Sequence, residues 1–126
     1  MSQQSELLKE RTMTFSVSVL RLIDRLPHTP GGLVVARQLA GSATSVGANY
    51  RSACSARSRR EFISKSCIVV EESEESVYWL DVIDRARMFD ESTITPVRQE
   101  AAELLAIFAK SLCTARANSR THPVAQ

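Results

Sequence analysis

Apolar side chains recur along this chain at steps of three and four residues, the spacing that places them on one face of an α-helix. The first segment shows the pattern without a break, in a seam formed by Leu8, Thr12, Phe15, Val19, Leu22 and Leu26. Three further seams follow, near Val46, Leu80 and Leu104. No run of alternating apolar and polar residues, as a half-buried strand would need, competes with this pattern. The periodicity predicts an all-α protein.

Prolines and capping residues divide the pattern into four helices. The segment 26–30 holds two prolines and ends the first helix, because each proline disfavours helix in the residue before it. A threonine followed by proline, an N-cap with a first-turn proline, predicts helix starts at 30 and 96. Ser58 with Glu61 three residues later fits a capping box. The predicted helices are about 5–26, 30–56, 59–88 and 96–116, followed by a polar tail at 117–126.

Length and composition fit a single domain spanning 1–126. Of the 126 residues, 44% are hydrophobic and 24% are charged, which is ordinary for a globular protein. Only four glycines and four prolines are present, so little material is left for turns and long helices are favoured. Amphipathic helices of this length joined by short loops predict an antiparallel, up-down-up-down four-helix bundle.

Neither a membrane span nor a secretory signal is indicated. The longest apolar run, 104–109, is far shorter than the ~20 residues that a spanning helix needs. The polar start at 1–6 lacks the apolar region of a signal peptide, so a cytoplasmic protein is expected. Cys54, Cys67 and Cys113 are widely spaced without a CxxC pair, and are expected to be reduced core or seam residues.

A polar row runs beside the apolar seam of the second predicted helix. The polar row is Gln38, Ser42, Ser45, Asn49 and Ser52, and the seam is Leu39, Ala43, Val46, Tyr50 and Ala53. Polar groups beside a packing seam cost stability unless each finds a partner. Glu72, Glu75 and Trp79 step along one face of the third helix, so Asn49 is expected to bridge to a carboxylate, with the hydroxyls of Ser42 and Ser45 completing the network. A structural network that fixes helix register is the favoured interpretation, and a ligand or nucleotide site and a subunit interface stay open.

Charge is segregated along the chain although the net charge is only +2. Basic residues cluster around the predicted turn between the second and third helices, at Arg51, Arg57, Arg59, Arg60 and Lys65. The stretch 71–81 holds five acids and no base. Such a basic cluster at one end of a bundle suits contacts with nucleic-acid phosphates. The alternatives are a solvated charged turn, or bases that pair with the acids of a neighbouring subunit.

Aromatic residues for base stacking are not interleaved with these bases. Phe62 is predicted in the core, and Tyr50 belongs to the apolar seam. Nucleic-acid binding would therefore be directed to the backbone and only weakly selective for sequence.

Enzymatic chemistry finds no support in the sequence. A di-iron bundle needs Glu-x-x-His pairs, but no histidine lies near Glu72 or Glu75, and the two present are His28 and His122. No hydrolase nucleophile elbow and no phosphate-binding glycine-rich loop occurs. A non-enzymatic protein without metal or cofactor is expected.

An ordered set of motifs resembles a known family. The motifs are Leu26-Pro27, Gln38-Leu39, Ser42-x-x-Ser45, Asn49, Ser58-Arg59-x-x-Phe62 and Glu72-x-x-Glu75-x-x-Tyr78-Trp79-Leu80. Together they resemble the "four helix bundle protein" family, which includes proteins encoded within intervening sequences of bacterial large-subunit ribosomal RNA genes. That family is similar in fold to the accessory variability determinant of diversity-generating retroelements.

The resemblance implies an antiparallel bundle that assembles into a homopentamer with a central channel. It also implies a non-enzymatic role tied to nucleic acid, with RNA or DNA and a reverse transcriptase as partners in the retroelement relatives. Many relatives carry an arginine where Gly41 stands and an acid where Ser52 stands, which suggests that an ion pair is lost here. Two functions follow: a homo-oligomer that binds nucleic acid through its basic cluster, or a protein-interaction module such as a reverse-transcriptase accessory without direct nucleic-acid binding.

Overall fold

Four helices make up the regular structure of residues 2–121, the part of the chain that the computed structural model describes. They are α1 (Gln3–Ile23), α2 (Pro30–Cys54), α3 (Arg59–Arg85) and α4 (Glu91–Thr121). No strand occurs within these residues. The prediction of an all-α, four-helix protein is therefore confirmed. None of these helices is long and apolar enough to cross a membrane.

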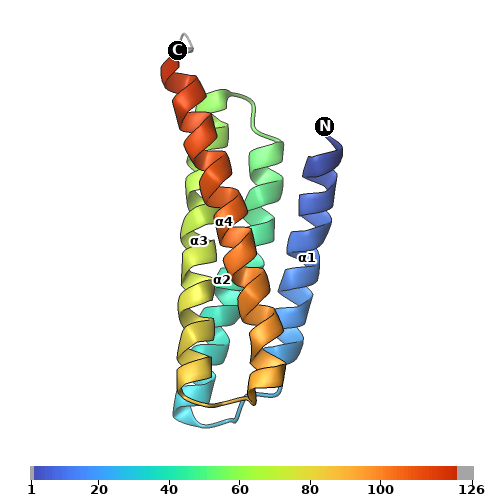
Figure 1. Ribbon diagram of the computed structural model, residues 1–126, viewed down its shortest axis with the longest axis vertical. Coiled ribbons are helices and arrows are strands. Elements are labelled where there is room, and N and C mark those ends of the chain that lie inside the picture. Colours follow the sequence, from blue (N-terminus) through green and yellow to red (C-terminus); the bar gives the residue numbers. More distant parts are fainter. Residues whose placement is uncertain (1, 122–126) are drawn as a thin grey trace.

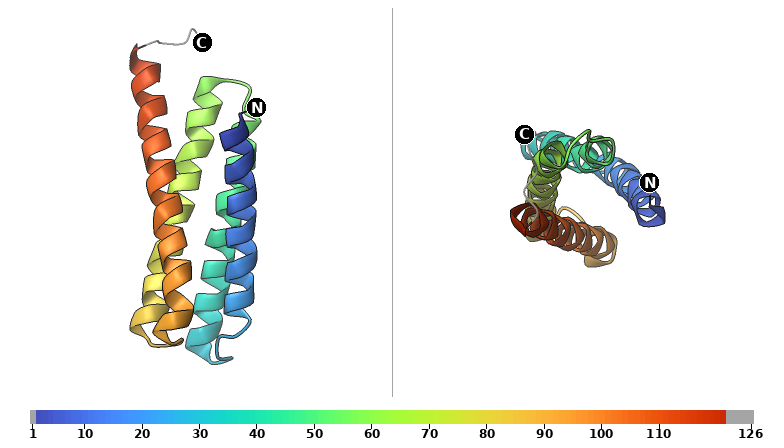
Figure 2. Two further views of the ribbon diagram at one scale, coloured as in Figure 1. Left: turned by 45° about the vertical axis from the view of Figure 1, so that its right-hand side comes forward. Right: turned by 90° about the horizontal axis from the view of Figure 1, so that it is seen from above.

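The helices lie lengthwise beside one another (Figure 1). The α1–α2 and α3–α4 connections lie at one end of the molecule, and the α2–α3 connection lies at the other, beside the start of α1 and the end of α4. Among the helix pairs that touch, contacts are most extensive between α2 and α3 and least extensive between α1 and α4. Figure 2 shows α1 and α4 standing apart when the molecule is seen from above. The end that carries the α2–α3 connection is consequently open on one side.

The core consists of the predicted apolar seams. Phe15 and Val19 of α1, Leu39 and Val46 of α2, and Leu80 of α3 are at most 2% exposed. From α4 the core takes Ile94, Ala101, Leu104 and Phe108. These side chains form one contiguous cluster, and their removal from water supplies the main force that holds the helices together.

Local capping sets where α2 and α3 begin. The hydroxyl of Thr29 accepts a hydrogen bond from the Gly32 backbone N–H, with Pro30 in the first turn. The hydroxyl of Ser58 accepts one from the Glu61 N–H at 3.0 Å. Gly32 is required by a close approach, because an added Cβ would meet the Pro27 carbonyl oxygen. The starts predicted from these two caps are confirmed.

The predicted start of the fourth helix is wrong. The helix begins at Glu91, and Pro96 lies inside it instead of opening it. Asp90 provides the start: its carboxylate accepts hydrogen bonds from the hydroxyls of Ser92 and Thr93, and its carbonyl accepts from the Ile94 N–H. The additional turn also buries the Ile94 side chain completely. Both gains offset the one backbone donor that the proline removes.

The ends of α1 and the C-terminal ends of α2 and α3 differ from the sequence prediction by two or three residues, and α4 ends five residues later than predicted. Helix α1 ends at Ile23, yet Leu26 stays in the core through a turn in which its N–H donates to the Ile23 carbonyl. Helix α3 is followed by Arg87, the one described non-glycine residue with positive φ. Of the predicted tail at 117–126, residues 117–121 continue α4, and residues 122–126, including His122, lie outside the described residues.

Candidate nucleic-acid interface

The five predicted basic residues lie together around the α2–α3 connection, and we call them the basic turn. Arg51 is in the last turn of α2, Arg57 is in the connection, and Arg59, Arg60 and Lys65 are in the first two turns of α3. The four arginines are exposed and Lys65 is half-buried. Their charged groups are therefore gathered at the open end of the bundle, where a polyanion can reach them.

Arg57 and Arg59 each make a weak local contact. Arg57 Nε lies 3.6 Å from Glu61 Oε2, but its side chain is 90% exposed, and such a pair contributes little. Arg59 Nη1 lies 3.5 Å from the Asn118 carbonyl oxygen, which ties the start of α3 to the end of α4. These contacts orient the guanidinium groups and leave most of the arginine surface in water.

Helix α4 adds two cations to the same end of the bundle. The sequence interpretation missed both of them. Lys110 and Arg116 are both exposed, and Arg116 Nη2 donates to Cys67 Sγ of α3 at 3.0 Å. A sequence signal for them exists, since the chain carries no acid after Glu103. Linking that signal to the basic turn requires knowing that the end of α4 lies beside the start of α3 (Figure 1).

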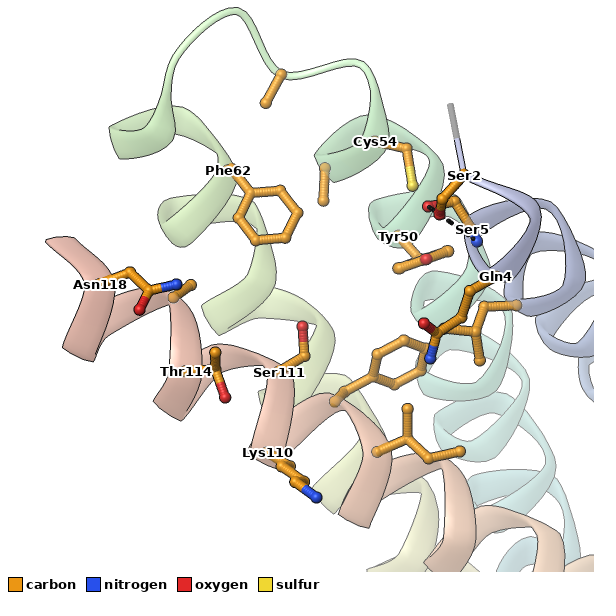
Figure 3. Close-up of a pocket in the computed structure, with 16 residues that line it drawn as sticks. Ser2, Gln4, Ser5, Tyr50, Cys54, Phe62, Lys110, Ser111, Thr114 and Asn118 are labelled. Atoms are coloured by element: carbon orange, nitrogen blue, oxygen red, sulfur yellow. Dashed lines mark hydrogen bonds between the residues drawn. The ribbon is translucent and has the colours of Figure 1, made fainter.

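A cavity of about 750 Å³ opens beside the basic turn, and we call it the end cavity. All four helices contribute to its wall, because α1 and α4 stand apart at this end. Tyr50, Phe62 and Phe108 supply aromatic surface, with the Tyr50 and Phe108 ring centroids 5.1 Å apart. Figure 3 shows Phe62 on the α3 side of the cavity and Tyr50 on the α2 side. The predicted placement of Phe62 in the core is wrong: it is half-buried and lines this cavity.

Polar groups complete the wall of the end cavity. They come from the start of α1 and the end of α4: Ser2, Gln4, Ser5, Lys110, Ser111, Thr114 and Asn118. Burial raises the pKa of Tyr50 to about 12. No aspartate or glutamate is among the described residues that line the cavity. The wall thus combines aromatic and aliphatic surface, the latter including Leu8 and Ile107, with neutral polar groups, and Lys110 is the one cation among the described lining residues.

The polar row of α2 meets α3 through a serine pair. Ser76 Oγ donates to Ser42 Oγ at 3.2 Å, and both side chains are buried. The sequence interpretation missed Ser76, although Ser66, Ser73 and Ser76 recur at helical spacing and all three are buried. Every buried side-chain nitrogen or oxygen within residues 2–119 has a hydrogen-bond partner. The buried member of the row, Ser42, is therefore satisfied inside the bundle, whereas Gln38 and Ser52 at its two ends are exposed.

Asn49 does not make the bridge expected of it. Its side-chain amide donates to the Ser45 carbonyl of its own helix at 2.9 Å, instead of to a carboxylate of α3. The contact that most resembles the expected network between α2 and α3 joins Glu72 and Ser45. Burial, followed by the negative charge of Glu75, raises the pKa of Glu72, and a hydrogen bond to Ser45 opposes that rise. Glu75 itself is exposed, and Trp79 is half-buried with its ring edge-on to Tyr78.

The remaining candidate chemistry is sparse. No group of three or more His, Cys, Asp or Glu side chains in the described part of the chain is placed to hold a metal ion. The three cysteines are unpaired thiols, and Cys113 is exposed, which differs from the expected core or seam position. The basic turn and the end cavity are the features left for a binding function.

Comparisons with known proteins bear on the whole bundle. The family model described as 23S rRNA-intervening sequence protein matches residues 6–110. A crystal structure of a protein with unknown function from the S23 ribosomal protein family of Bacteroides thetaiotaomicron VPI-5482 is similar, with 26% sequence identity and a TM-score of 0.79. That similarity covers 87% of this chain and 98% of the other. No curated protein matches.

Proposed function

This chain belongs to the 23S rRNA-intervening sequence protein family, and we propose that it is a non-enzymatic, homo-oligomeric helical protein that binds RNA or DNA through its basic turn. The observation that carries the proposal is the gathering of exposed cations at one end of the bundle, four arginines from the basic turn together with Lys110 and Arg116. Phosphate contacts from such a cluster give affinity that depends little on sequence.

Self-assembly is supported by apolar side chains that the single chain leaves in water. Met13, Val17 and Leu20 of α1 are 46%, 37% and 41% exposed, and their spacing of four and three residues places them on one helix face. Leu33 and Val34, near the start of α2, are 50% and 54% exposed. Such surfaces commonly mark interfaces. We assign this face to contacts with further copies of the chain, in the homopentamer that the family resemblance implies.

The alternative is a protein-interaction module, such as a reverse-transcriptase accessory protein, without direct nucleic-acid binding. The observation in its favour is the exposed acidic surface of α3, formed by Glu71, Glu74 and Glu75. Pairing of that surface with the basic turn of a neighbouring subunit would occupy the arginines.

Salt dependence separates the two functions. We expect a labelled mixed-sequence single strand to bind in fluorescence anisotropy titrations, with a log–log salt slope of about −3.5 for five phosphate contacts. Joint substitution of Arg57, Arg59 and Arg60 by alanine should make the slope shallower by about 2. The matched control removes the same charge at the other end of the bundle, by alanine at the exposed Arg21, Arg37 and Arg85. Absence of salt-sensitive binding, or equal losses in both variants, would refute the proposal and favour the interaction module.

A further inference from the structure

We infer that the end cavity receives an unpaired nucleobase of a strand whose phosphates lie on the basic turn. The inference rests on the proposed nucleic-acid function and names the form of nucleic acid that the site takes. The first observation is the position of the end cavity beside the basic turn. Ala56, which lines the cavity, directly precedes Arg57, and Asn118, which also lines it, accepts a hydrogen bond from Arg59 through its carbonyl. A strand held by these arginines therefore passes the mouth of the cavity.

The wall chemistry fits a nucleobase better than it fits a purely apolar ligand. Tyr50 and Phe62 present aromatic surface, on which any base can stack. Across from them, Ser111, Thr114 and Asn118 present neutral donors and acceptors. An apolar ligand would bury those groups without partners, at a cost in affinity, whereas the edge of a base offers donors and acceptors of its own.

Charge and size point in the same direction. Lys110 is the only charged side chain among the described lining residues, which disfavours a cationic ligand and suits one attached to phosphate. The volume of about 750 Å³ lies within the range of about 300 to 1,000 Å³ typical of ligand sites. A base can enter only when it is unstacked and unpaired, because the bases of a duplex are closed in the helix. The site should therefore prefer single strands and loops over duplexes.

Phe62 provides a direct test. It lines the cavity but is not part of the core cluster, so Phe62→Leu should fold, which thermal unfolding checks. We expect this variant to bind a single strand about fivefold to a hundredfold more weakly, with an unchanged salt slope, because stacking does not release counterions. Duplex binding should not change. The matched control is Tyr78→Leu, which removes an aromatic side chain of the same helix that is 60% exposed and outside the cavity.

An abasic strand supplies the second half of a thermodynamic cycle. It keeps the phosphates and lacks the bases, so it should bind wild-type protein at least as weakly as the intact strand binds Phe62→Leu, and Phe62→Leu should cause no further loss on it. Ser111→Leu, at an exposed position on α4, partly fills the cavity from the other side and should weaken single-strand binding in the same way.

The outcomes separate this inference from the proposed function. Salt-sensitive binding that disappears with the three arginines but is unaffected by Phe62→Leu, Ser111→Leu and loss of the bases would overturn the inference and leave the function standing. A free nucleoside monophosphate that binds as tightly as the strand would also overturn it. Absence of salt-sensitive binding by the wild-type protein would refute both.

Discussion

Arg11 of α1 forms a bidentate ion pair with Glu100 of α4, with Nε 2.8 Å from Oε2 and Nη2 2.7 Å from Oε1. Among the helix pairs that touch, these two helices have the least extensive contact. Arg11 Nη2 also reaches Glu103 at 3.1 Å, and the hydrogen bond to Glu100 raises the pKa of Arg11 above its usual range. The pair holds together the edge of the bundle along which α1 and α4 stand apart.

Removing this pair should loosen α1 more than the rest of the bundle. We expect Glu100→Gln to lower the free energy of unfolding by about 1 kcal/mol, since both side chains are about a third exposed and two hydrogen bonds are affected. Glu103→Gln is the matched control, because Glu103 is 67% exposed and makes one contact, so its effect should be smaller. Urea unfolding measures both. Hydrogen exchange should show the loss of protection concentrated in α1, and a uniform loss would contradict this role.

The close contact between α1 and α2 depends on Gly47, which has no side chain. A Cβ added at Gly47 would lie 3.1 Å from Thr12 Oγ1 and 3.2 Å from Thr12 Cβ, and Thr12 is fully buried and stiff at χ1. We expect Gly47→Ala to destabilise the protein by about 1 kcal/mol or more, because overpacking outweighs the gain in helix propensity. Gly41→Ala, with nothing within 4 Å of the added atom, should stabilise it by up to about 1 kcal/mol. Equal melting temperatures for the two variants would contradict the close approach.

Glu72 should make stability depend on pH. Burial and Glu75 raise its pKa in the folded protein above the ordinary value of 4.5. The group therefore favours the folded state most below its unfolded pKa, and this contribution is lost as the pH rises through the raised folded pKa. We expect Glu72→Gln to stabilise the protein at neutral pH and to have little effect below about pH 4. Urea unfolding over this range, with the exposed Glu74→Gln as control, measures it. Stabilisation that does not vary with pH would contradict the assignment.

The sequence predicts those parts of the fold that are determined locally. The caps at Thr29 and Ser58 involve residues three positions apart, so the starts of α2 and α3 could be predicted. The start of α4 could not, since two local signals compete and the burial of Ile94, a contact between helices, decides between them. The pairing of Ser42 with Ser76 depends on how α3 is rotated against α2, to which local spacing gives only an approximate answer.

One part of the candidate site could likewise be predicted from local sequence, and the other part could not. The basic turn is continuous in sequence and could be found by counting charges. The end cavity could not, because it is built from the ends of four helices and depends on the separation of α1 and α4. Phe62 illustrates the difference: its helical spacing is that of a core residue, and only the arrangement of the helices leaves it beside a cavity.

The exposed apolar face of α1 predicts the state of assembly. We expect light scattering at micromolar concentration to give about five times the chain mass of 14.0 kDa for the wild-type protein. Val17→Asp should reduce this to the mass of a single chain, because it places a charge between Met13 and Leu20 in an interface that would have to desolvate it. Ser18→Asp introduces the same charge at the next position, which is exposed on a different side of α1, and should leave the assembly intact. A wild-type mass of 14.0 kDa, or an unchanged mass for Val17→Asp, would refute the assignment of this face. Circular dichroism separates loss of assembly from loss of folding, because a dissociated but folded chain keeps its helical signal.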